Sequence, residues 1–192
     1  MSGSAVPVDA WLEQLGLAPA ARVQRDGTTA WDLLLDGRRR FDLRLTIIWQ
    51  PGVGLVVWLP FAPPVQDGHR RTYQQLLQWN DELPFVKFGL DPDLRIVLSV
   101  EVAPEAADAR VLGLAIARIL AVCDHLLDAS AGWLWPGGVR RAPELGRVSR
   151  GRALLDRYAG ELAELTGAPA TLGRGDRVAE RGAPDRQKAG GR

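Results

Sequence analysis

Residues 73–102 restrict the possible folds of this chain more than any other stretch. Apolar residues recur at helical spacing up to Leu83. The helix then ends at Pro84, because proline cannot continue a helix and disfavours helical angles in the residue before it. Two apolar runs follow, separated by the turn sequence at residues 91–93. The stretch therefore predicts a helix followed by two strands that pair in an antiparallel way.

Residues 40–49 give the clearest strand signal in the chain. Apolar and polar side chains alternate strictly here, which is typical of an antiparallel sheet with one solvated face. The side chains expected to face the core are Phe41, Leu43, Leu45, Ile47 and Trp49. Those expected to face solvent are Arg40, Asp42, Arg44 and Thr46.

Other periodic segments complete the predicted fold. Strands are also expected at residues 28–35, 54–61, 85–90 and 94–102, and helices at residues 8–17, 69–83, 107–127 and 150–166. We therefore predict an α+β fold with a single five-stranded antiparallel sheet and helices packed on it. The element order is α-β-β-β-α-β-β-α, followed by an extra C-terminal helix.

Length and charge indicate one compact domain with a basic extension. A chain of 192 residues is long enough for one core and short for two. Residues 139–192 carry a net charge of +5, against −4 for the remainder and +1 for the whole chain. We assign residues 1–138 to the domain and residues 139–166 to a basic segment with a helix. Residues 167–192 are rich in Gly, Ala and Arg, and we expect them to be disordered.

The sequence around Pro84 carries a characteristic set of positions: Asn80, Leu83-Pro84-Phe85, Lys87-Phe88, Asp91, Asp93 and Ile96-Val97-Leu98. At these positions the chain resembles the YbjN family, whose members are similar in fold to type III secretion chaperones. The resemblance covers about residues 8–136. The resemblance implies a chaperone-like or adaptor fold that binds another protein, often as a homodimer, with no enzyme activity and no cofactor.

The chain has no feature that is typical of a secreted or membrane protein. The first residues lack a basic region followed by an apolar core, and no apolar run approaches the roughly 18–20 residues of a membrane-spanning helix. Cys123 is the only cysteine, so no intramolecular disulfide can form. We therefore expect a cytoplasmic protein in which Cys123 packs in the core.

No catalytic or cofactor-binding motif occurs in the sequence. The phosphate-binding glycine loop, the dinucleotide-binding glycine pattern and the nucleophile elbow are all absent. Asp124, His125 and Asp128 would make only a weak metal-ligand set, because metal sites usually use more His or Cys. We favour a solvated helix face there, with a metal-dependent hydrolase as the alternative. The prediction is a non-enzyme without cofactor, catalytic or metal site.

Asn80 is a polar residue on the apolar side of its predicted helix. An amide in this position must find hydrogen-bond partners. We expect these to be main-chain groups freed by Pro84, and a direct contact with another protein is the alternative.

The seven tryptophans are the most unusual feature of the composition. Four of them fall on faces that are expected to pack in the core. Aromatic side chains are also favoured anchors at protein interfaces. The candidate partner-binding residues are Trp58, Phe61, Trp133 and Trp135. The alternative is that these four cover the edge of the sheet or pack under a helix.

The basic segment contains clustered arginines that suggest a second kind of contact. Such cations bind phosphate backbones, although the segment has only Tyr158 as a base-stacking aromatic residue. The candidate phosphate contacts are Arg147, Arg150, Arg152 and Arg157. A solvated, partly helical segment is the alternative that we favour.

These features together predict a non-enzymatic protein-binding module, chaperone-like or adaptor. It would bury an apolar or extended segment of a partner protein on a sheet face, a sheet edge or a helix groove. The alternative is an accessory protein in nucleic-acid metabolism. That protein would act through the basic segment or through a nucleic-acid-binding partner.

Overall fold

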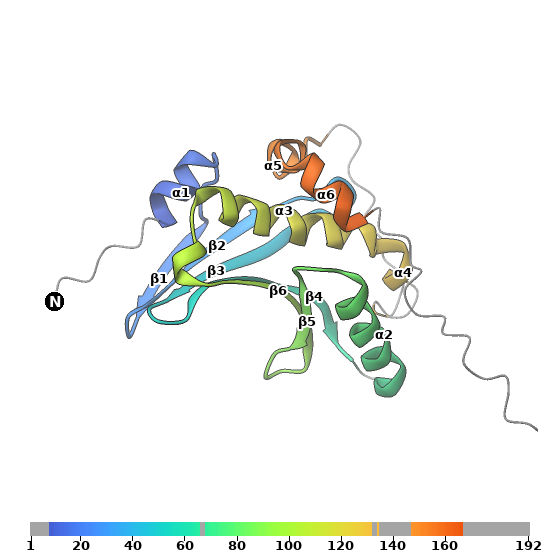
Figure 1. Cartoon of the computed structure of the whole chain (residues 1–192). Coiled ribbons are helices and arrows are strands. Elements are labelled where there is room, and N and C mark those ends of the chain that lie inside the picture. Colours follow the sequence, from blue (N-terminus) through green and yellow to red (C-terminus); the bar gives the residue numbers. More distant parts are fainter. Residues whose placement is uncertain (1–7, 66–67, 132–133, 135–146, 167–192) are drawn as a thin grey trace, which may run out of the picture.

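A computed structural model describes residues 8–65, 68–131, 134 and 147–166 of the chain (Figure 1). Within these residues, six antiparallel strands form one sheet in the order β1-β2-β3-β4-β6-β5. The strands are β1 (Ala21–Arg25), β2 (Thr28–Leu35), β3 (Leu43–Gln50), β4 (Gly54–Pro64), β5 (Lys87–Leu90) and β6 (Arg95–Val102). The predicted α+β class with one antiparallel sheet is confirmed, and the predicted number of five strands is wrong.

The helices lie mainly on one side of this sheet. They are α1 (Val8–Gln14), α2 (His69–Glu82), α3 (Ala109–His125), α4 (Leu127–Ala131), α5 (Arg152–Arg157) and α6 (Ala159–Thr166), with a 3-10 turn η1 (Pro104–Ala106). In Figure 1, α3 runs along the sheet, and α5 and α6 lie on the outer side of α3. The single helix predicted over residues 150–166 is therefore two short helices that meet at the buried Tyr158.

The missing strand in the prediction is β1. It pairs with β2 through a turn in which Asp26 and Gly27 have φ angles of 50° and 79°. Two consecutive positive φ angles are typical of the tight hairpin turn that Asp-Gly favours. All five residues of β1 are exposed, so the strand has no apolar alternation that could reveal it.

The core lies between the sheet and α3. On β3, Leu43, Leu45 and Ile47 are buried as predicted, while Trp49 is only partly buried. Phe41, which was predicted for the same strand, precedes β3 and is partly buried. Each neighbouring strand adds apolar side chains to the same face, and α3 covers them with its own apolar residues. The buried side chains of the other strands on this face include Trp31, Leu33, Leu55, Val57, Leu59, Ile96 and Leu98.

Asn80 attaches α2 to the edge of the sheet. Its side-chain amide donates to the Phe88 carbonyl oxygen (3.1 Å) and its carbonyl oxygen accepts from the Phe88 N–H (2.6 Å). The expected main-chain partners of Asn80 therefore exist, and they belong to β5. Because β5 is the last strand of the sheet, these groups have no neighbouring strand on that side. Asn80 thus satisfies backbone groups that would otherwise be unpaired at the edge of the sheet.

Replacing Asn80 by Ala should lower the free energy of unfolding by about 1–3 kcal/mol, because the N–H and C=O of Phe88 lose their partner at a partly buried site. Urea unfolding measures this change. Gln78 is an exposed residue of the same helix and serves as the control. Its replacement by Ala should change the free energy by less than about 0.5 kcal/mol. Equal effects of the two changes would contradict the role of Asn80 at the edge.

Candidate partner-binding surface

The side of the sheet that faces away from α3 has an apolar strip across its central strands. Because side chains alternate along a strand, every second residue of β2, β3, β4 and β6 points to this side. We call this surface the open face. Its half-buried apolar residues include Ala30, Ile48, Val56, Trp58 and Val97. Strand β4 is apolar on both of its faces. Because α3 lies on one side of the sheet, it covers only one of these faces.

Trp58 lies at the centre of the open face. On β4 it stands opposite Thr46 of β3 and Ser99 of β6. Its indole N–H is buried, and within the described residues it has no hydrogen-bond partner. Tryptophan usually pairs this group when it is buried.

Polar side chains flank Trp58 on the two neighbouring strands. The Thr46 hydroxyl donates to the Asp32 carboxylate (2.7 Å) in the same row of the sheet. Lys87 lies opposite Ser99, and Glu101 lies opposite Val56. An apolar centre with a polar rim of both charge signs is the usual anatomy of a protein–protein interface.

Phe61, another predicted partner-binding residue, does not join Trp58 on this surface. Phe61 is fully buried, with its ring edge-on to Phe88 (5.1 Å between centroids) and to Trp79 (6.4 Å). The prediction that Phe61 contacts a partner is therefore corrected: it is a core residue. It sits where the β4–β6 register shifts between Pro60 and Ala62. Trp133 and Trp135 lie outside the described residues.

Phe85 is an exposed aromatic residue that the sequence interpretation placed in a strand. It has a φ of 68° and exposes 62% of its surface. The left-handed region is strained for an aromatic residue, and such strain persists only where the surroundings enforce it. The Arg118 guanidinium of α3 lies 4.0 Å from the ring centroid. The Leu-Pro-Phe step was the only sequence signal for this position. Because Phe85 is exposed, it is a second aromatic candidate for contact with a partner.

Three of the four candidate phosphate contacts pair with carboxylates. Arg150 donates through Nε and Nη2 to the two oxygens of Asp36, at 2.7 Å each. Arg147 donates to both oxygens of Asp42, at 2.7 and 3.1 Å. Arg152 is exposed and pairs with Asp156 at 3.6 Å, and Arg157 is exposed. Phosphate binding by these arginines stays a prediction, and for Arg147 and Arg150 it would require exchange of these partners.

Asp36 is fully buried and ionised. Burial alone would raise the pKa of its carboxyl. Hydrogen bonds from the Arg150 side chain and from the main-chain N–H groups of Asp42 and Arg150 outweigh burial and lower the pKa from 3.8 to about 2. Hydrogen bonding to Asp42, countered by desolvation, raises the pKa of Arg147 above its usual value. No local sequence pattern indicates the Asp36–Arg150 pair, because the two residues are 114 positions apart.

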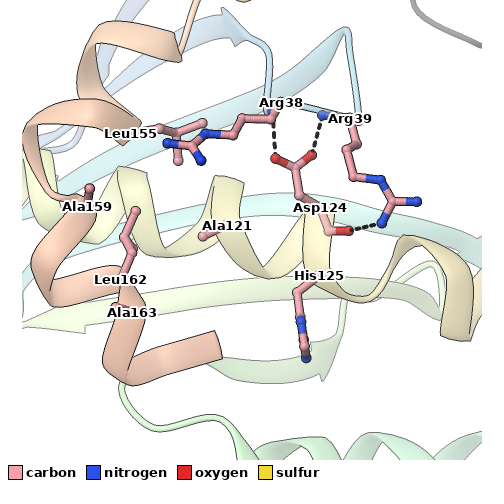
Figure 2. Close-up of a pocket in the computed structure, with 9 residues that line it drawn as sticks. All are labelled: Arg38, Arg39, Ala121, Asp124, His125, Leu155, Ala159, Leu162 and Ala163. Carbon is pink, nitrogen blue, oxygen red and sulfur yellow. Dashed lines mark hydrogen bonds between the residues drawn. The ribbon is translucent and has the colours of Figure 1, made fainter. Parts of the chain in front are cut away.

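Asp124, one of the three weak metal-ligand candidates, has a different use. Its carboxylate accepts the main-chain N–H groups of Arg38 (2.5 Å), Arg39 (2.9 Å) and Arg40 (2.8 Å). Figure 2 shows the carboxylate directed at the loop that carries Arg38 and Arg39. His125 is exposed and Asp128 pairs with Arg39 at 2.7 Å. Within the described residues, no group of three His, Cys, Asp or Glu side chains is placed to bind a metal ion.

A groove of about 410 Å³ lies beside Asp124, between α3 and the C-terminal helices (Figure 2). Its apolar lining comes from Ala121 on α3 and from residues of α5 and α6. Arg38 and Arg39 extend to opposite sides of Asp124 at its rim, and each is paired with an aspartate. The C-terminal lining residues are Leu155, Ala159, Leu162 and Ala163.

Cys123 is a packed core thiol, as predicted. It is completely buried in α3. Burial raises the pKa of the thiol to about 11, so it remains protonated and unreactive at neutral pH.

Residues 5–131 match the model of the YbjN family, described as "Putative bacterial sensory transduction regulator". No curated protein matches the sequence. The description names a regulator and not a class of enzyme. Across the described residues, no helix is long and apolar enough to cross a membrane.

Acid should destabilise the fold through Asp36. Because the folded-state pKa is lowered to about 2, the ionised carboxylate contributes stability that is fully present above about pH 4 and is lost as the pH falls towards 2. At pH 6, the variant Asp36→Asn should have a free energy of unfolding about 2 kcal/mol below wild type. The difference should shrink as the pH falls.

Urea unfolding between pH 2 and pH 7 measures this dependence. Asp26, whose side chain is 89% exposed in its pair with Arg25, provides the control variant Asp26→Asn. The control should follow the wild-type curve. A wild-type minus Asp36→Asn difference that does not vary with pH would contradict the assignment.

Proposed function

The chain belongs to the YbjN family, and we propose that it is a non-enzymatic protein-binding module, chaperone-like or adaptor in action. The regulator named in the family description fits a protein that acts by binding. The proposal is that a partner protein binds on the open face and that Trp58 is the central contact.

The observation that supports this proposal most is the apolar strip around Trp58, which stays partly exposed among the described residues. The strands that form it are central strands, so both of their edges are already paired and only the side chains are available. Helices α1, α3, α5 and α6 lie on the other side of the sheet (Figure 1). A contiguous apolar surface with a polar rim marks an interaction site in a globular protein.

The partner that suits this surface is an amphipathic helix or an apolar extended segment. A flat sheet face offers side chains and no free main-chain groups, so a bound segment would be held by apolar contact. Thr46 and Ser99, on either side of Trp58, would add hydrogen bonds at the centre. Burial of a central tryptophan commonly contributes about 2 kcal/mol or more to such a complex.

A cytoplasmic location and a homodimer are further parts of the proposal. The single buried cysteine is compatible with a reducing compartment. In a homodimer, the open faces of two copies would bind each other through the same apolar strip. Sedimentation equilibrium of the full chain separates a dimer on this face from a monomer that binds a different protein, because Trp58→Glu would dissociate only the former.

Replacing Trp58 by Glu should remove partner binding while the fold is retained, because a charge would be placed at the centre of an apolar contact. Affinity capture from the native cell with the tagged full chain measures the loss, and Trp58→Phe should keep most binding. Thermal unfolding verifies that each variant is folded.

The matched control is Leu77→Glu, which places the same charge on an exposed leucine of α2. It should bind partners like wild type. Unchanged capture by Trp58→Glu would contradict the assignment of the open face. Loss of capture with Leu77→Glu alone would move the binding surface to α2 and the exposed Phe85.

A further inference from the structure

The outward side of α3 is a second apolar surface, on the other side of the sheet from the open face. Residues 109–125 of α3 are buried around almost the whole helix. The sheet covers one side. Much of the other side is covered by residues 147–166, which we call the tail segment and which lie beyond the family match at residues 5–131. The part of the chain typical of the family thus has a helix with an apolar outward side, and an additional segment covers it.

The tail segment packs on α3 through a defined set of apolar side chains. They are all buried, and they comprise Leu154, Leu155, Tyr158, Leu162 and Leu165. Tyr158 lies so close to Gly113 of α3 that a Cβ at Gly113 would collide with the Tyr158 hydroxyl. The position of Tyr158 on α3 is therefore fixed by shape as well as by apolar contact.

Charge complementarity fixes the start of the tail segment. Asp36 receives the bidentate pair from Arg150 and also the Arg150 main-chain N–H (3.0 Å). The Ser149 hydroxyl donates to the Asp36 carbonyl oxygen (3.0 Å). Asp42 receives Arg147 and a further bond from Arg150 (2.7 Å). Bidentate arginine–carboxylate pairs are specific in geometry, and this one is buried on the Asp36 side.

Gly151 is the residue that lets the chain turn from this pair onto α3. A Cβ at this position would overlap the Asp36 carbonyl group and the Leu120 side chain. Only glycine therefore fits between the paired arginine and the first helical turn. The contact thus selects a sequence: two arginines three residues apart, a glycine directly after the second, and then an amphipathic helix.

We propose that the outward side of α3, with Asp36 and Asp42, is a docking site for protein segments of this chemistry. The chain's own tail segment occupies it. The site recognises the segment by its side chains and not only because the two are linked. An Arg-x-x-Arg-Gly segment leading into an amphipathic helix in another protein would compete with the tail segment for the site.

The groove of Figure 2 indicates that the tail segment does not fill the site completely. Ala159 and Ala163 line it on the tail side, opposite Ala121. A larger apolar side chain at either position would cover more of the α3 surface. A competing segment with such a residue would bind more tightly than the tail segment itself.

The test is an exchange experiment on the full chain. A protease site is introduced between residues 139 and 145, and the chain is cut after purification. A fluorescent synthetic peptide of residues 147–166 is then added, and its binding is followed by fluorescence anisotropy. The cut tail should remain associated at high concentration and exchange with the peptide on dilution.

Changes placed in the peptide leave the body of the protein unaltered. Arg150→Ala and Gly151→Val should weaken binding at least tenfold, and Ala163→Leu should strengthen it. Arg152→Ala removes the same charge from a side chain that is 71% exposed, and it should bind within about twofold of the unmodified peptide. The Trp58→Glu protein should bind the peptide normally, so failure of the open-face proposal and failure of this one are distinguishable.

Two outcomes would overturn the docking site. One is that the cut tail dissociates at all concentrations and that the peptide does not bind to the protein that has lost it. The other is equal weakening by Arg150→Ala and Arg152→Ala, because that would show only general attraction between charges.

Discussion

Helix α3 is apolar around its circumference, and the remaining structure is arranged to cover it. Every residue from Leu112 to Cys123 is buried or half-buried. A helix of this kind is normally buried, with apolar neighbours on both of its sides. The sheet supplies one neighbour, while α1 and the two C-terminal helices supply the other. The C-terminal helices therefore belong to the same core as the sheet, although they lie outside the residues matched to the family.

Two buried carboxylates join these layers through one loop. Asp124 of α3 accepts three main-chain N–H groups from the loop between β2 and β3. Asp36, at the start of that loop, accepts the Arg150 guanidinium from the C-terminal segment. A buried charge is tolerated only where donors satisfy it, and both groups meet that condition. The loop is thereby attached to α3 on one side and to the C-terminal helices on the other.

The sequence revealed those elements that have a local signal. The alternation in residues 40–49 and the helix stop at Pro84 were sufficient for β3, α2 and the fold class. Strand β1 had no signal, because all five of its residues are exposed. Trp58 was recognised because it lies opposite the apolar face of its own strand. Phe61 was misplaced although it follows Leu55, Val57 and Leu59 in the same alternation, and all four are buried in the core. The Asp36–Arg150 pair was not predictable, since no local pattern connects residues 114 positions apart.

The two sides of the sheet differ in how their apolar surface is covered, and this difference separates the two proposed sites. Strand β3 directs Ile47 into the closed core and Ile48 to the open face. A partner on the open face would thus contact side chains whose backbone is already fixed by that core. It would touch no residue of the C-terminal segment or of its docking site. Sites that share no residue and lie on opposite sides of a rigid layer are expected to bind independently. Coupling between them would require the sheet itself to change its twist, and then each ligand would alter the affinity of the other by the same factor.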